Sequence, residues 1–136
     1  GLQHADDFAA LGNAARAQRA PLLIVFTQAS CIHCDIAKRD YLVPMSNSAE
    51  LRGKVIVREI DIDSRARLRD FSGQAVTAKE FAQRYRVRSV PTVIVMDAAG
   101  KPAAPPVVGL LAEDFYGLYL QQAIDEGRLK MGASRQ

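Results

Sequence analysis

The chain has 136 residues, of which 49% are hydrophobic and 24% are charged, and its formal net charge is +3. A chain of this length forms one domain with a real core and leaves little room for a second, so we expect a single domain over residues 1–136. The basic residues are spread out and do not alternate with aromatic residues, which argues against nucleic-acid binding. No apolar run approaches the roughly 20 residues that cross a bilayer, so the sequence predicts no membrane span.

The chain opens with a predicted helix followed by a predicted strand. Over residues 4–18 the apolar side chains of Phe8, Leu11 and Ala15 recur at helical spacing and are expected to face the core. Residues 22–27 then form an uninterrupted apolar run, which is typical of a strand in the middle of a sheet covered on both faces.

A second helix and a second strand are predicted next. Ser30 is a good N-cap for a helix that runs to about residue 42 and stops before Pro44, because the residue preceding a proline disfavours helix. Residues 54–62 (KVIVREIDI) predict a strand, which should be parallel to the first because a helix lies in the crossover between them. Residues 64–76 are basic and irregular and are interpreted as an inserted loop.

The next helix and two further strands have clear local signals. Thr77 and Glu80 form a capping box for a helix that runs to about Tyr85. Residues 92–96 predict the third strand. A last strand near Val107 must be short and at an edge, since Pro102, Pro105 and Pro106, which precede it, cannot donate to a ladder.

A closing helix completes the predicted fold. It is expected over residues 111–126, with Gly127 as its C-cap and residues 128–136 as a tail. Three of its apolar residues are expected to anchor it on the core: Phe115, Leu118 and Tyr119. The whole order predicts an α/β domain with a central mixed sheet of about four to five strands and helices on both faces.

The only two cysteines, Cys31 and Cys34, follow the first predicted strand directly, where a helix begins. A disulfide between them would close a very short loop, which constrains the unfolded chain weakly, so stabilisation is a poor reason for the pair. Two cysteines and the adjacent His33 do not complete four-coordinate zinc, and His4 is the only other histidine. We therefore expect no metal and no other cofactor, and the pattern favours redox chemistry.

The position of the two thiols suggests different roles for them. Only a thiolate attacks a disulfide, and the backbone N–H groups of a helix N-terminus stabilise a thiolate. Cys31 is therefore the candidate nucleophile and Cys34 the candidate resolving thiol. His33 is a third candidate catalytic residue, since its imidazole can stabilise the thiolate. The alternative for His33 is that it is an ordinary solvent-exposed residue at a helix start, without a role in the chemistry.

The element order, with Cys31-Ile32-His33-Cys34 after the first core strand and Val90-Pro91-Thr92 before the third, resembles the thioredoxin superfamily. The resemblance covers roughly residues 21–127. In detail, the stretches FTQASCIHC and VRSVPTVIVMDAAGK look most similar to bacterial periplasmic thioredoxins of the sulfur-oxidation (SoxW/SoxS) type, which keep partner proteins reduced.

This resemblance implies a thiol–disulfide oxidoreductase in the periplasm that reduces disulfides of partner proteins. It implies electrons from a membrane thiol transporter of the DsbD type, and we expect the protein to be a monomer. The family places a cis proline beside the cysteines, which implies a cis Pro91 and a Val90 backbone free to pair with an extended substrate. Ile32, between the cysteines, joins Val90 and Pro91 as a substrate-binding candidate.

Three departures from the family's cytoplasmic pattern bear on the mechanism. Ser30 replaces a tryptophan, and Ile32-His33 replaces Gly-Pro. Val25 replaces the buried aspartate that accepts a proton from the second cysteine. Glu59, in the second predicted strand, is a candidate substitute, because a buried carboxylate is a better proton acceptor than an exposed one. A solvated edge position and an arginine partner are the alternatives for Glu59.

The direction of electron flow stays open at this point. A histidine just before the second cysteine also occurs in the oxidase DsbA and in protein disulfide isomerases, so a DsbA-like oxidase or an isomerase is an alternative. A second alternative is a redox-switched binding module, in which the disulfide changes affinity for a partner without turnover.

Overall fold

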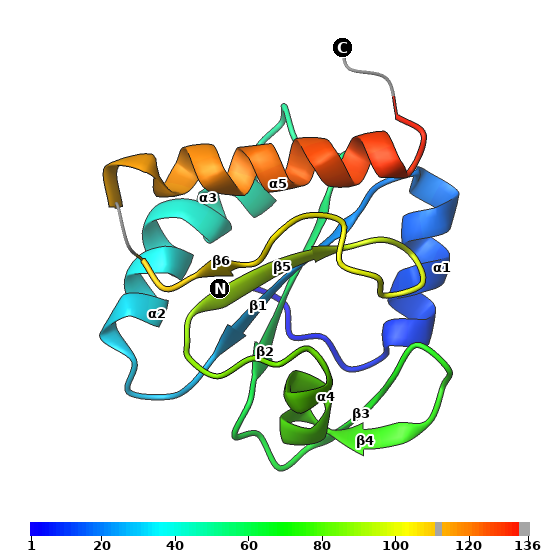
Figure 1. Ribbon diagram of the computed structural model, residues 1–136, viewed down its shortest axis with the longest axis vertical. Coiled ribbons are helices and arrows are strands. Elements are labelled where there is room, and N and C mark those ends of the chain that lie inside the picture. The colour runs from blue at the N-terminus through cyan, green and yellow to red at the C-terminus, as the bar shows by residue number, and fades with distance from the viewer. Residues whose placement is uncertain (111–112, 134–136) are drawn as a thin grey trace.

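A four-stranded mixed sheet forms the centre of the molecule (Figure 1). The computed structural model describes residues 1–110 and 113–133. The strand order is β2–β1–β5–β6, with bounds β1 Leu22–Thr27, β2 Ile56–Asp61, β5 Thr92–Met96 and β6 Val107–Val108. β1 is parallel to β2 and antiparallel to β5, and β5 is antiparallel to β6. The predicted parallel pair, the mixed sheet and the short edge strand are confirmed.

Helices cover both faces of this sheet, as predicted. They are α1 (Phe8–Gln18), α2 (Ile32–Ala37), the π-helix η1 (Lys38–Leu42), α3 (Val43–Ser46), α4 (Ala78–Arg84), the 3₁₀ helix η2 (Glu113–Phe115) and α5 (Tyr116–Lys130). Side chains alternate along a strand, so β1 supplies both cores. Leu22, Ile24 and Phe26 pack with α1 and α4, whereas Leu23 and Val25 pack with α2, η1 and α5.

The side of the sheet covered by α1 and α4, called here the aromatic face, is held by a cluster of rings. The rings of Phe8 and Phe81 stack with their centroids 4.2 Å apart, and both side chains are almost fully buried. Phe26, Phe71 and Tyr85 surround this pair at centroid distances of 5.1 to 6.4 Å. The opposite side, called here the disulfide face, is covered by α2, η1 and α5.

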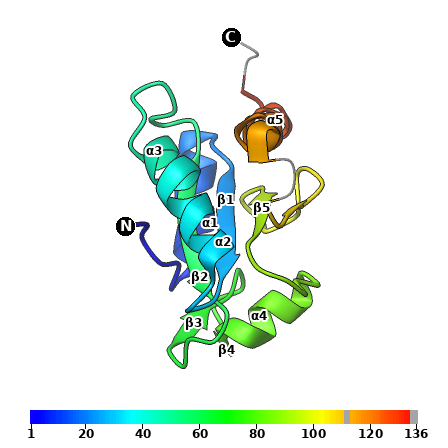
Figure 2. The ribbon, with the colours of Figure 1, turned by 90° about the vertical axis from the view of Figure 1, so that its left-hand side faces the viewer.

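The N-terminal helix begins later than predicted. The Asp7 carboxylate accepts a hydrogen bond from the Ala10 N–H, and this cap starts α1 at Phe8 rather than at residue 4. Residues 1–7, the N-terminal segment, run instead beside β2 (Figure 2). His4 lies opposite Glu59 in a parallel bridge. The backbone groups of Gln3 and Ala5 bond to Glu59 at the edge of the sheet, the Asp6 carbonyl accepts from the Arg69 N–H, and the Asp7 carbonyl accepts from α1, at Leu11.

The predicted stop before Pro44 is wrong. The chain continues as a helix from α2 through η1 into α3, and Val43 has helical dihedral angles. The Val43 N–H bonds to the Lys38 carbonyl, which is the wider spacing of a π-turn. Pro44 then falls in the first turn of α3, directly after this π-turn, so the helix accommodates the proline at the point where its hydrogen-bond spacing already changes.

The insert at residues 64–76 is more regular than predicted. It contains a two-stranded antiparallel hairpin, β3 (Arg67–Arg69) with β4 (Ala75–Thr77), and not only an irregular loop. Leu68 and Val76 are its two buried apolar residues and pack on the aromatic face. The predicted capping of α4 is confirmed, since the Thr77 hydroxyl accepts the Glu80 N–H.

The closing helix differs from its prediction in phase and length. The three predicted anchors Phe115, Leu118 and Tyr119 are exposed, and the residues that face the core are instead Tyr116, Leu120, Ala123 and Ile124. Gly127 lies inside α5, which ends at Lys130, so Gly127 is no C-cap. A Cβ there would approach Val95 Cγ1 to 2.7 Å, so this glycine permits close packing. The predicted start at residues 111–112 lies outside the described residues.

Candidate functional site

Cys31 and Cys34 form a disulfide at the start of α2, with their Cα atoms 5.2 Å apart. Cys31 is the N-cap of α2, and its Sγ accepts a hydrogen bond of 3.1 Å from the Cys34 N–H. Ser30, the predicted cap, has φ 57°, whereas an N-cap needs the extended backbone that Cys31 has. Cys31 is partly exposed and Cys34 is fully buried, so only one sulfur is accessible to a large partner.

The two residues between the cysteines point away from the core. Ile32 is 74% exposed, which is unusual for an isoleucine and gives the surface beside the disulfide an apolar side chain. His33 is also exposed. Both positions therefore agree with contact to a partner, and neither side chain is needed for packing.

The loop before β5 lies at the same end of the sheet as the disulfide. β1 and β5 are antiparallel and Phe26 pairs with Thr92, so the end of β1 lies beside the start of β5. The Val90–Pro91 peptide bond is cis. The Pro91 carbonyl accepts the Gly109 N–H at 2.8 Å, whereas the Val90 backbone makes no hydrogen bond within the described part of the chain. The Val90 amide and carbonyl thus remain available to an extended peptide.

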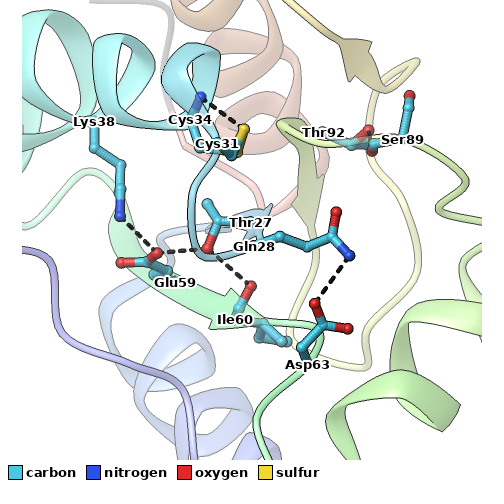
Figure 3. Close-up of a disulfide and its surroundings, with 10 residues drawn as sticks. All are labelled: Thr27, Gln28, Cys31, Cys34, Lys38, Glu59, Ile60, Asp63, Ser89 and Thr92. Carbon is cyan, nitrogen blue, oxygen red and sulfur yellow. Dashed lines mark hydrogen bonds and ion pairs between the residues drawn. A yellow bond between two sulfur atoms is a disulfide. The ribbon is translucent and has the colours of Figure 1, made fainter.

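Glu59 lies on the disulfide face of β2, directly beside Val25 in the sheet register. Its residue is only 5% exposed, which excludes the solvated edge position. Its Oε2 accepts hydrogen bonds from the Lys38 Nζ at 2.9 Å and from the Thr27 hydroxyl (Figure 3). The partner is therefore a lysine and not an arginine.

These contacts connect Glu59 to both sides of the cysteine pair. Thr27 ends the strand that leads to Cys31, and Lys38 follows Cys34 by four residues, one helical turn along. Figure 3 shows the Lys38 and Thr27 side chains converging on the Glu59 carboxylate. Sequence reasoning missed both residues. The i, i+4 spacing from Cys34 was a signal for Lys38, but only the parallel pairing of β1 and β2 brings Glu59 within reach.

The described residues show neither a metal-binding cluster nor a membrane-spanning helix. Within residues 1–110 and 113–133, no three side chains of His, Cys, Asp or Glu gather closely enough to hold a metal ion. None of the helices in these same ranges has both the length and the apolar character needed to cross a bilayer. The disulfide is the one redox-active group that the described residues offer.

The family follows from comparison with known sequences. The family model described as "Thioredoxin-like domain" matches residues 9–124, most of the chain. The chain belongs to this thioredoxin-like family. No curated protein sequence matches the chain. A Cys-x-x-Cys disulfide on this fold supports thiol–disulfide oxidoreductase chemistry in general.

Solved thioredoxin structures have the same fold. The thioredoxin of Fasciola hepatica superposes with a TM-score of 0.61 at 16% identity, covering 90% of this chain and 96% of its own. Mitochondrial thioredoxin 3 from Saccharomyces cerevisiae, in its oxidized form, gives 0.60 at 15% identity, covering 90% and 92%. Thioredoxin NaTrxh from Nicotiana alata gives 0.57 at 18% identity, covering 89% and 94%. At these identities the likeness concerns the fold, and the predicted thioredoxin-like fold is confirmed.

Proposed function

We propose that this protein reduces disulfides in periplasmic partner proteins, with Cys31 as the nucleophile and Cys34 as the resolving thiol. The observation that carries the proposal is the asymmetry of the pair. Cys31 is partly exposed at the cap of α2 with the Cys34 N–H donating to its sulfur, whereas Cys34 is buried. A donated N–H stabilises a thiolate, so the accessible sulfur is also the one that is activated.

The reaction balances as two exchanges. The Cys31 thiolate attacks one sulfur of the partner's disulfide, the partner's S–S bond breaks, and its other sulfur leaves as a thiolate. Cys34 then loses its proton and attacks the Cys31 sulfur. The mixed disulfide breaks, the second partner thiolate leaves, and the Cys31–Cys34 disulfide forms. Two electrons pass from the pair to the partner.

Glu59 is the proposed acceptor of the Cys34 proton. Cys34 is fully buried, so its proton needs an acceptor inside the protein, and Glu59 is a buried carboxylate linked to both flanks of the motif through Thr27 and Lys38. It stands beside Val25, the position at which related proteins carry an aspartate. In this proposal the proton acceptor lies on β2 instead of β1, on the same face of the sheet.

The partner's chain is proposed to lie across Ile32 and the Val90–Pro91 loop. The Val90 backbone is free to add a short stretch of β-pairing to an extended segment, and the exposed Ile32 adds apolar contact. His33 is proposed to stabilise the Cys31 thiolate from the next position in the chain.

The cellular setting is proposed from the likeness of FTQASCIHC and VRSVPTVIVMDAAGK to periplasmic thioredoxins of the sulfur-oxidation type. A reductase there receives electrons across the membrane, and a transporter of the DsbD type is the proposed donor. The protein is proposed to act as a monomer without a cofactor, the disulfide itself carrying the electrons.

Variants of the two cysteines test the proposal. With insulin as the disulfide substrate and dithiothreitol as the electron source, Cys31→Ser is expected to reduce turnover to the background rate. Cys34→Ser is expected to accumulate a mixed disulfide between Cys31 and the substrate, seen by mass spectrometry. Full turnover in Cys31→Ser would overturn the proposal.

Equilibration with glutathione tests the direction of electron flow. A reductase is expected to have a potential near about −270 mV, whereas a value near about −120 mV indicates a DsbA-like oxidase. A redox-switched binding module predicts no turnover by the wild-type protein but different binding of one partner by its two redox states.

A further inference from the structure

The two carboxylate oxygens of Glu59 face different surroundings. Oε2 accepts the hydrogen bonds from Lys38 and Thr27, which come from the side of the cysteine pair. Oε1 lies 3.5 Å from the Nε2 atom of His4, on the side of the N-terminal segment. The lone pairs that remain for a proton are therefore on the oxygen that faces an imidazole.

The backbone fixes His4 in this position. The Glu59 N–H donates to the Gln3 carbonyl and the Ala5 N–H donates to the Glu59 carbonyl, both at 2.9 Å. His4 is thus held between two hydrogen bonds to the very residue that its side chain approaches. His4 and Glu59 are paired as in a parallel β-bridge, and this pairing sets the position of His4 along β2.

His4 also connects the buried carboxylate to water. The Glu59 side chain is 6% exposed and the His4 side chain 59% exposed. A cavity of about 450 Å³ lies between them and α2, lined among others by His4, Asp35, Lys38, Arg39 and Glu59. Figure 2 shows the N-terminal segment entering beside α2 on its way to β2.

Among these groups only the imidazole is suited to pass a proton to and from Glu59. The Lys38 Nζ donates to Oε2 and the Arg39 guanidinium pairs with Asp40, so neither is the group that faces Oε1. Asp35 lines the cavity but makes no hydrogen bond or ion pair with Glu59 in the described part of the chain. Histidine exchanges protons readily between about pH 5 and 8.

We infer that His4 transfers the proton that Glu59 takes from Cys34 to the solvent, and returns it in the reverse reaction. The inference rests on the proposed function, with Glu59 as the proton acceptor. As the Cys34 sulfur bonds to Cys31 and the partner thiolate leaves, one proton moves from Cys34 to Glu59. It passes from Oε1 to the His4 Nε2 and then to water in the cavity, which restores Glu59 to its ionised form for the next cycle.

The test separates the two exchange steps. The reduced protein is mixed with an excess of glutathione disulfide and quenched with acid at successive times. Mass spectrometry then gives the rate at which the glutathione–Cys31 mixed disulfide forms and the rate at which Cys34 resolves it. In His4→Gln, resolution at pH 6 to 7 is expected to be slower by about tenfold, below the roughly hundredfold typical of a direct acid–base group. The first step is expected to keep its wild-type rate.

Two further variants remove a merely structural explanation. His4→Ala leaves room in the cavity, so added imidazole is expected to restore resolution in this variant but to leave the wild type unchanged. Gln3→Ala, the matched control, keeps the backbone bonds of the segment and changes a side chain that does not line the cavity. It is expected to resolve at the wild-type rate.

The outcomes distinguish this inference from the function it rests on. If the wild type forms no mixed disulfide, the proposed reductase fails and the inference with it. If Glu59→Gln slows resolution but His4→Gln does not, only the role of His4 is overturned. Equal losses in His4→Gln and Gln3→Ala, or a loss in His4→Ala that imidazole does not restore, also overturn it.

Discussion

The two faces of the sheet have opposite contents. On the aromatic face, Phe8 and Phe81 stack at 4.2 Å inside a cluster of rings, and the buried contacts are almost all apolar. The disulfide face also has a buried apolar cluster, yet it holds a carboxylate at Glu59, the buried Cys34 and a tyrosine hydroxyl at Tyr116. Buried polar groups lower stability unless they are hydrogen-bonded.

The difference indicates that the two faces of the sheet have different roles. The aromatic face supplies stabilisation and needs no chemistry, while the disulfide face keeps polar groups whose desolvation a purely structural core would avoid. Substitutions on the aromatic face should therefore change stability and leave thiol reactivity unchanged. Three measurements test this contrast.

The largest effect is expected from Phe81→Ala. The variant removes a ring that is 1% exposed and contacts the rings of Phe8 and Phe71, so the free energy of unfolding should fall by about 3–5 kcal/mol. Urea denaturation measures this loss. The alkylation rate of Cys31 in the reduced, folded variant should match the wild type, and a changed rate would mean that the two faces are coupled.

The acid stability of the aromatic side is expected to depend on Asp70. The Arg84 guanidinium at 2.8 Å, with further hydrogen bonds from Ser72 and Gln74, holds the pKa of the Asp70 carboxyl well below its ordinary value of 3.8. A carboxyl whose folded pKa is depressed stabilises the fold above its unfolded pKa and loses that contribution as the pH falls through the folded one.

Asp70→Asn should therefore flatten the fall in unfolding free energy below about pH 4. Denaturation of both proteins across this range measures it. The matched control is Asp63→Asn, because the Asp63 carboxylate is exposed and accepts a hydrogen bond from the neutral Gln28 amide. An acid limb as steep in Asp70→Asn as in the wild type would contradict the prediction.

The smallest effects are expected from two tyrosines, one on each face. The Tyr85 hydroxyl donates to the Gly100 carbonyl at 2.6 Å, so Tyr85→Phe should lower the free energy of unfolding by about 1 kcal/mol. The buried Tyr116 hydroxyl has no hydrogen-bond partner among the described residues. Tyr116→Phe should therefore raise the free energy of unfolding, by at most about 1 kcal/mol, because a desolvated hydroxyl is removed.

The alkaline limb gives an independent check on the same pair. Burial raises the pKa of Tyr85 and of Tyr116 to about 12. A folded pKa above the unfolded value gives stability that is full below about pH 10 and is lost as the pH rises toward the folded value. Each phenylalanine variant should lose less unfolding free energy above pH 10 than the wild type. At neutral pH, Tyr85→Phe should still be less stable than the wild type and Tyr116→Phe more stable.

Local signals were enough for much of the fold. β1 and β5 occupy the predicted residues, and Thr77 caps α4 as its capping box indicated. Each of these depends on a few neighbouring residues, such as a β-branched run or a side chain three positions from an N–H. The phase of α5 was predicted wrongly, because its apolar residues occur on more than one side and only the sheet selects which side is buried.

At the site, the sequence determined the chemistry of Cys31 and Cys34, because a strand, a turn and a helix start are local and bring the pair together without distant contacts. Tertiary structure alone decided the surroundings of Glu59. Lys38, Thr27 and His4 come from separate segments, and they converge because β2 pairs in parallel with β1 on one edge and with the N-terminal segment on the other. Such pairing is specified by the packing of the whole sheet, so no local pattern in the sequence contains it.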